Sequence, residues 1–141
     1  MRFVYPFETE LDGEIVQVRF PDVPEAITEV NMANELLDDM AHDCLIAALR
    51  TYVSERESIP RPSAVGNRPA IALTALESAK IALAMAMQKI EISNTALAER
   101  LGVTELIVRR MLDLDHRNHI GQVEMALDEL GWKLEISVKA A

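Results

Sequence analysis

The sequence predicts an α+β protein made of two small domains, and three observations support this prediction. On the two sides of the turn dipeptide Asp12-Gly13, residues 3–7 alternate aromatic and other side chains and residues 16–20 alternate apolar and polar ones, so residues 2–20 are interpreted as a β-hairpin. Residues 74–131 repeat apolar side chains every three or four positions, which is typical of packed helices. A stretch rich in proline and glycine separates the two patterns. We therefore expect a sheet-and-helix domain followed by an all-α domain.

The first domain, residues 1–66, is expected to begin with the hairpin. Val16, Val18 and Phe20 lie on one face of its second strand, and polar residues separate them. Two prolines stand in the segment 21–24, so we expect this segment to interrupt the strand pairing. A short third strand would follow at residues 26–29.

An amphipathic helix is expected next, with Asn31 as its N-cap and its end near residue 57. The apolar stripe of this helix is predicted to consist of Leu37, Met40, Cys44, Ala48 and Tyr52. Residues 67–73 then form a connecting strand or linker, because the run 70–73 is short and apolar. The predicted order of the first domain is β-β-β-α-β.

Capping residues define four helices in the second domain, residues 74–141. N-terminal capping signals stand at Thr74 with Glu77, at Ser93 and at Thr104. Gly102 and Gly131 are expected at helix C-termini, where the left-handed backbone conformation favours glycine.

Residues 97–104 match the spacing of a helix-turn-helix. Ala98 is small enough for two helices to approach closely, and Gly102 permits a sharp turn. Val103 then supplies an apolar turn residue, and Thr104 caps the second helix. A helical bundle without a role in DNA binding would need the same packing, so the spacing by itself leaves both interpretations open.

The second helix of this motif would present its side chains to the major groove of DNA. Arginine binds a guanine edge or a phosphate, and flanking polar residues contact phosphates. The residues expected to contact DNA are Thr104, Glu105, Leu106, Arg109, Arg110, Arg100, Arg117 and Asn118. Residues 93–120 hold four arginines and four acids, so a single copy should bind DNA weakly and a second copy is needed.

The end of the chain suggests how two copies associate. Leu134, Ile136 and Val138 alternate with polar residues, which predicts a C-terminal strand. A lone strand after helices lacks a partner, so these three residues are expected to form a homodimer, or a higher oligomer, by pairing with the same strand of a second chain. Pairing with the sheet of its own chain is the alternative.

Acidic residues are concentrated in the first half of the chain. Residues 1–65 contain thirteen Asp or Glu and five Arg, a net charge of −8, whereas residues 66–141 have a net charge of −1. An acidic surface repels nucleic acid and attracts a basic partner. The same acidity would also serve simply to keep a protein soluble.

Nothing in the sequence indicates an enzyme, a metal site or a membrane protein. The three histidines have no cysteines at metal-binding spacing, and there is no nucleophile or phosphate-loop motif, so we expect no catalysis and no cofactor. No apolar run has the roughly 18 residues that a membrane span requires. The single cysteine, Cys44, cannot form an internal disulfide, which suits a cytoplasmic protein.

The order of these parts resembles that of HicB antitoxins that carry a repressor-like helix-turn-helix. The resemblance covers nearly the whole chain, and its most specific stretches are residues 20–26, 58–63, 97–102 and 130–134. It implies a partial RNase H-like fold for the first domain, which would bind and block a HicA toxin, an mRNA endonuclease. It also implies that the second domain represses the operon by binding operator double-stranded DNA. The residues expected to contact the toxin are Tyr5, Glu8, Glu10, Asp12, Asp22 and Glu25.

Two other functions are considered. A stand-alone repressor would sense a small ligand in its first domain, in a pocket lined by the four aromatic residues Phe3, Tyr5, Phe7 and Phe20. A nuclease would need clustered carboxylates on adjacent strands. The first strand instead has Val4, Tyr5 and Pro6 where an active RNase H needs a metal-binding carboxylate, so the fold would act as a scaffold only.

Overall fold

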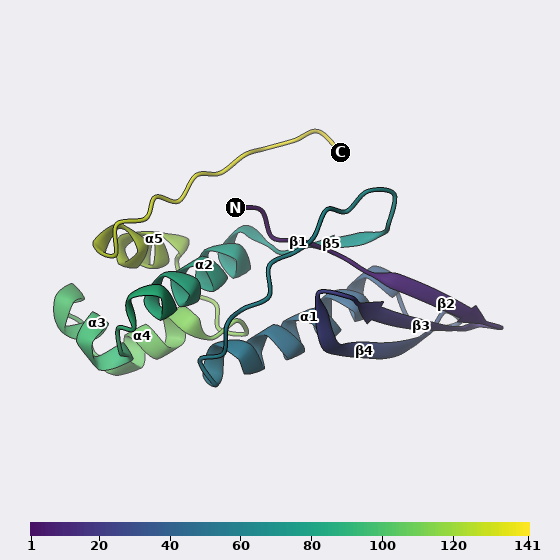
Figure 1. Ribbon diagram of the computed structural model, residues 1–141, viewed down its shortest axis with the longest axis horizontal. Coiled ribbons are helices and arrows are strands. Elements are labelled where there is room, and N and C mark those ends of the chain that lie inside the picture. The colour runs from purple at the N-terminus through teal and green to yellow at the C-terminus, as the bar shows by residue number, and fades with distance from the viewer. The chain divides into compact units, whose positions relative to one another are not determined.

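Strands and helices follow the predicted α+β order in the computed structural model, which describes all 141 residues. The unit Met1–Leu73 contains β1 (Val4–Pro6), β2 (Glu8–Asp12), β3 (Ile15–Phe20), β4 (Val23–Asn31), α1 (Leu37–Ser54) and β5 (Ala70–Ala72) (Figure 1). The unit Thr74–Ala141 contains α2 (Ala75–Ile90), α3 (Asn94–Leu101), α4 (Glu105–Leu112) and α5 (Ile120–Glu129). None of these helices combines the length and the apolar character that crossing a bilayer requires.

The first unit is built on an antiparallel sheet in the order β2-β3-β4, with α1 packed against β4. The predicted face of β3 is confirmed, because Val16, Val18 and Phe20 are buried and the residues between them are exposed. Gly13 makes the turn between β2 and β3 with a φ of +62°. This alternation buries one face of the sheet and leaves the other to solvent.

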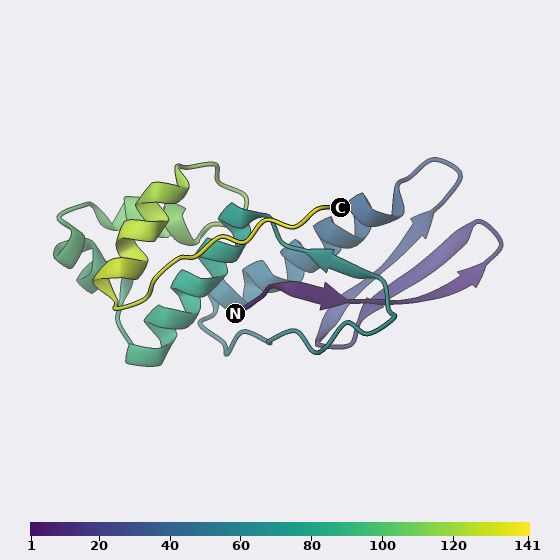
Figure 2. The same cartoon turned by 90° about the horizontal axis from the view of Figure 1, so that it is seen from above.

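The predicted hairpin strand divides at Phe7 into β1 and β2, which have different partners. β1 pairs with β5 in register Tyr5↔Ile71, and the two strands lie side by side in Figure 2. β2 pairs with β3. The division follows from the backbone, because Phe7 N–H donates to the carbonyl oxygen of Pro69 at 2.9 Å. The Phe7 side chain is buried and contacts the ring of Phe20, with 5.6 Å between ring centroids.

The prediction that residues 21–24 interrupt the strand pairing is wrong for Val23, which pairs with Phe20, although the register is irregular around it. β4 begins at Val23, and only Pro21 and Asp22 form the turn after β3. Arg19 pairs with Ile27, yet the next residue, Phe20, pairs with Val23, so residues 24–26 bulge out of the register. A bulge of this kind accommodates Pro24, which has no N–H for the ladder.

The predicted start of the long helix is also wrong. Asn31 ends β4, and its side-chain oxygen accepts a hydrogen bond from Ala33 N–H at 3.0 Å in a turn, while α1 begins at Leu37. The apolar stripe is shifted by about one position from the predicted one. The residues that α1 buries are Ala41, Leu45, Ile46 and Leu49, and the predicted stripe lies half-buried beside them.

The capping predictions for the second unit are confirmed. Thr74 and Glu77 form a reciprocal capping box. The Ser93 and Thr104 side chains accept hydrogen bonds from the backbones of Ala96 and Ile107. The four helices pack around a shared core whose most buried members are Ala79, Leu83, Leu97, Val108, Val123 and Ala126.

The predicted C-terminal strand is absent from the single chain. The polypeptide after Gly131 forms neither helix nor strand and is drawn as a thin line in Figure 1. The physical reason is that a strand needs a hydrogen-bonding neighbour, and every regular element of this unit is a helix.

Substituting Gly102 tests the left-handed backbone conformation of the turn between α3 and α4. It has a φ of +67°, and an added Cβ would meet no atom within 4 Å, so only the backbone conformation opposes a side chain. Gly102→Ala should therefore lower the free energy of unfolding by about 1 kcal/mol, the cost of a left-handed L-residue. The matched control is Gly121→Ala in α5, where there is equal space but no left-handed strain. Urea denaturation should find the control neutral or stabilised, and equal effects at both sites would contradict the assignment.

Candidate functional sites

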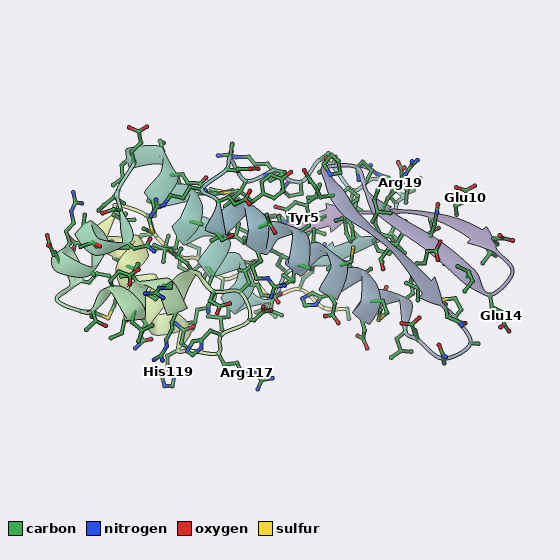
Figure 3. The ribbon with its side chains drawn as sticks, turned by 90° about the horizontal axis from the view of Figure 1, so that it is seen from below. Tyr5, Glu10, Glu14, Arg19, Arg117 and His119 are labelled. Carbon is green, nitrogen blue, oxygen red and sulfur yellow. The ribbon has the colours of Figure 1, made fainter.

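Three of the predicted toxin-contact residues lie in a row on β2, which is an edge strand of its sheet. Glu8, Glu10 and Asp12 alternate along this strand, so their side chains share one face. Glu10 and Asp12 are exposed, and Glu14 follows at the hairpin turn. Figure 3 shows Glu10 and Glu14 at the same end of the sheet. We call this row and Glu14 the acidic edge.

A shallow depression of about 540 Å³ adjoins the acidic edge on the solvent face of the sheet. Its lining includes Glu10, Gln17, Arg19 and Ile27, which come from three different strands. Arg19 is bound to Glu8, with 3.1 Å between guanidinium nitrogen and carboxylate oxygen. Glu8 is therefore neutralised within the sheet, and the unpaired negative charge of the row lies toward its Asp12 end.

The other three predicted contact residues hold the fold together. Tyr5 is completely buried, and its hydroxyl donates to the carbonyl oxygen of Pro60 at 2.7 Å. Burial, together with the charge of Asp22, raises the pKa of Tyr5 to about 12. Asp22 accepts two hydrogen bonds of 2.8 Å from the backbone and hydroxyl of Ser63. The stretches 20–26 and 58–63, which the sequence analysis singled out, are thus bound to each other.

Glu25 similarly connects β4 to α1 through a hydrogen bond. Its carboxylate accepts a hydrogen bond of 2.7 Å from the hydroxyl of Tyr52. This hydrogen bond holds the pKa of Glu25 below its ordinary value and raises the pKa of Tyr52 to about 12. Glu25 is exposed, so it contributes to the acidic surface while it is tied to the helix.

The four aromatic residues considered as a ligand pocket are part of the core. Phe3, Tyr5, Phe7 and Phe20 are all buried. Their rings fill the space beneath the sheet, so they do not line a cavity for a ligand.

Helices α3 and α4 meet across the turn at Gly102 with the predicted geometry. Ala98 is buried in the shared core, and Val108 and Met111 of α4 point into the same core. Thr104 caps α4. The opposite face of α4 carries Leu106, Arg109 and Arg110, which are exposed, and Arg100 is exposed at the end of α3.

Arg109 is bound to Glu105 one helical turn earlier, with 2.6 Å between guanidinium nitrogen and carboxylate oxygen. The hydrogen bond from Arg109 holds the pKa of Glu105 below its ordinary value, so this carboxylate is charged. Arg110 has no ion pair of this kind on α4. The outer face of α4 therefore presents one paired arginine and one unpaired arginine.

The loop between α4 and α5 carries the remaining candidates. Arg117 and His119 are exposed and project away from the ribbon in Figure 3. The side-chain nitrogen and oxygen of Asn118 are buried and have no hydrogen-bond partner. Asn118 would have to turn outward to reach a phosphate.

One residue beside this loop escaped the sequence analysis. Lys80 is buried within α2 and donates hydrogen bonds to backbone carbonyl groups at the end of α4 and in the loop. The sequence does contain one sign that Lys80 is unusual, because it is the only charged residue of α2 between Glu77 and Lys89.

The predicted dimerisation residues are increasingly exposed toward the C-terminus. Leu134 is half-buried against the core of the second unit, whereas Ile136 and Val138 are 65% and 93% exposed. There is no group of three or more His, Cys, Asp or Glu residues that could hold a metal ion.

Comparison with known proteins identifies the family. Residues 4–82 match the family model described as the HicB-like antitoxin of bacterial toxin–antitoxin systems. The chain is 36% identical to Antitoxin HicB 2 of Photorhabdus laumondii over 94% of both chains. It is 34% identical to Antitoxin HicB of Pseudomonas fluorescens over 99% of this chain and 96% of the relative. Against Antitoxin HicB of Escherichia coli K12 it is 32% identical over 84% of this chain and 86% of the relative.

The match to the family model includes the acidic edge, the bound stretches 20–26 and 58–63, and the start of α2. The similarity to the relatives extends through the helices of the second unit. Proteins of this family are antitoxins and not enzymes. The chain belongs to the HicB family of bacterial antitoxins.

Proposed function

We propose that this chain neutralises a HicA-type mRNA endonuclease with its first unit and represses its own operon with its second. The observation that carries the first half is the acidic edge, an edge strand whose exposed Glu10 and Asp12 have no ion-pair partner, on a domain with a net charge of −8 over residues 1–65. A toxin that binds RNA must be basic, so the two surfaces attract each other. Membership of the HicB family indicates that this partner is a HicA-type toxin.

The first unit serves this function as a scaffold with a partial RNase H-like fold. An antiparallel sheet with one helix on its buried face supports this assignment. The Val4–Pro6 strand contains no carboxylate, so it offers no ligand for a catalytic metal ion. In this arrangement Tyr5, Asp22 and Glu25 hold the stretches around the docking surface, and Glu8, Glu10 and Asp12 meet the toxin.

Reversing charge at the acidic edge tests the toxin surface. The double variant Glu10→Lys with Asp12→Lys should weaken binding to a catalytically inactive HicA-type toxin by at least about tenfold, because attraction becomes repulsion. The matched control is Asp38→Lys with Asp39→Lys, which makes the same charge change on the exposed face of α1. Titration calorimetry measures both affinities.

Equal losses of affinity in the two variants would show that only the overall charge matters, and no loss in either variant would exclude the acidic edge as the toxin-binding surface.

Co-expression tests the antitoxin function as a whole. A HicA-type toxin that arrests growth alone should become harmless when this chain is present, and continued arrest would contradict neutralisation.

The second unit is proposed to bind operator DNA through the outer face of α4. The support is geometric, because α3, the Gly102 turn and α4 bury the faces that a helix-turn-helix buries and leave Arg109 and Arg110 exposed. Thr104, Glu105 and Leu106 lie at the start of α4, where base contacts are made. Arg100, Arg117 and Asn118 flank it as phosphate contacts.

Substituting the two α4 arginines separates their roles. Arg110→Ala should weaken DNA binding by about 1–3 kcal/mol, the value of one arginine contact. Arg109→Ala should cost less, because Arg109 must first leave its ion pair with Glu105. The control is Arg61→Ala, which removes an exposed arginine from the first unit. Fluorescence anisotropy with a duplex selected by the wild-type chain measures the affinities, and an unchanged Arg110→Ala affinity would remove α4 from the interface.

A homodimer is proposed to form through the C-terminal segment. Leu134 is anchored on the core, and the exposed Ile136 and Val138 continue from it without a partner. Pairing these segments from two chains would satisfy both backbones and place two α4 helices on one operator. The charge around α4 favours this arrangement, because residues 93–120 have no net positive charge and one copy would bind weakly.

Deleting residues 133–141 should convert the dimer to a monomer in multi-angle light scattering. Operator affinity should fall with it, because the two DNA-binding units are no longer linked. The control deletion removes only residues 140–141 and leaves the apolar residues in place. A dimer that survives the longer deletion would assign dimerisation to another surface.

A further inference from the structure

Lys80 is the only charged residue that the structure buries. Its exposed fraction is 1%, and it lies on α2 among the apolar residues of the second unit's core. Burying a lysine ammonium group is unfavourable unless hydrogen bonds replace its water, so a buried lysine needs a specific set of partners.

Three backbone carbonyl groups provide those partners. Lys80 Nζ donates to the carbonyl oxygens of Arg110 at 3.0 Å, of Asp113 at 2.6 Å and of His116 at 2.6 Å. Three acceptors match the three N–H groups of a protonated amine, whereas a neutral amine has only two. Burial lowers the pKa of Lys80, and the negative charge of Asp113 opposes that shift. The geometry is therefore that of the charged form.

The three carbonyl groups belong to the end of α4 and to the loop that follows it. They are spaced three residues apart, so the backbone from Arg110 to His116 curves around a single nitrogen atom. Carbonyl groups at a helix C-terminus carry partial negative charge and have no partner within the helix. The Arg110 and Asp113 carbonyl oxygens also accept backbone hydrogen bonds from Asp113 and His116, so the ammonium group adds a second donor there and offsets the negative end of α4.

This backbone carries the side chains of the proposed DNA interface. Arg110 lies on the last turn of α4, and Arg117 follows directly after the third carbonyl group. The buried side-chain polar atoms of Asn118 in this loop have no hydrogen-bond partner, so Asn118 does not fix the loop. Lys80 therefore links the position of both arginines to α2.

We propose that Lys80 is a positioning residue for DNA binding, which sets the end of α4 and the Arg117 loop without touching the DNA. This inference rests on the proposed operator binding of the second unit. A lysine can support DNA binding by contacting a phosphate or by positioning other residues. Removing a phosphate-contacting lysine changes the salt dependence of the affinity, whereas removing a buried positioning lysine does not.

Lys80→Met tests this role, because methionine keeps much of the side-chain length and removes the three donors. The matched control is Lys89→Met on the same helix, where the exposed ammonium group lies over the Trp132 ring at 5.3 Å. Both variants lose one positive charge from α2. The DNA probe is the labelled duplex that the wild-type chain selects from a random-sequence pool, and all measurements are made where circular dichroism shows a folded protein.

Lys80→Met should exchange backbone amide hydrogens faster over residues 110–119, measured by mass spectrometry on the free protein. Its affinity for the duplex should fall by about tenfold, the equivalent of one lost charge-assisted contact, with an unchanged slope of affinity against salt. Lys89→Met should match the wild type in both measurements. The proposal would be overturned if Lys80→Met showed the same hydrogen exchange and the same affinity as the wild type. A reduced slope of affinity against salt in Lys80→Met would overturn it as well.

A second variant covers the case in which Lys80→Met does not fold. Lys80→Gln retains two N–H donors without the charge, and it should show intermediate exchange and affinity; wild-type values would overturn the proposal. The failure of operator binding itself is recognised separately. A wild-type chain that selects no duplex overturns the DNA-binding function, and the positioning role falls with it, whereas the exchange measurement reports on the Lys80 contacts in either case.

Discussion

Each of the two units must build its own core from a short stretch of chain, and this constraint governs the rest of the structure. A small domain buries a modest fraction of its surface, so it depends on its largest side chains to fill a core. The first unit places Phe3, Tyr5, Phe7 and Phe20 in its core, and the second fills the space between four helices with alanine, leucine and methionine. The proposed binding surfaces lie outside these cores, on the edge strand β2 and on the outer face of α4, where charged side chains stand beside the exposed Leu11 and Leu106.

The two surfaces differ in their charge. The acidic edge carries carboxylates that Arg19 neutralises only at its Glu8 end, so a negative field remains for a basic protein. The outer face of α4 has arginines, but nearby acids cancel their charge, and Glu105 already binds Arg109. If this surface binds operator DNA as proposed, affinity depends more on the placement of a few side chains than on overall attraction. On that proposal the position of α4 and its loop matters, and Lys80 contacts the backbone of both.

Several parts of the fold follow from the sequence because they depend on neighbours within a few residues. The caps at Thr74, Ser93 and Thr104 and the glycine after α3 are local hydrogen-bond or backbone preferences, and all are found where the sequence predicts them. The alternation in β3 is local in the same sense. Helix-turn-helix spacing and the family resemblance follow from the order of these local signals.

The sequence by itself thus determined the α+β class, the capped starts of α2, α3 and α4 and the HicB family. Only the tertiary structure decided the division of the first strand at Phe7, the bulge that accommodates Pro24 and the burial of Tyr5 against Pro60. It also decided the partners of Lys80. Each of these depends on a contact between residues that are far apart in the chain. Such contacts form only when a shared core brings them together, so no short-range pattern records them.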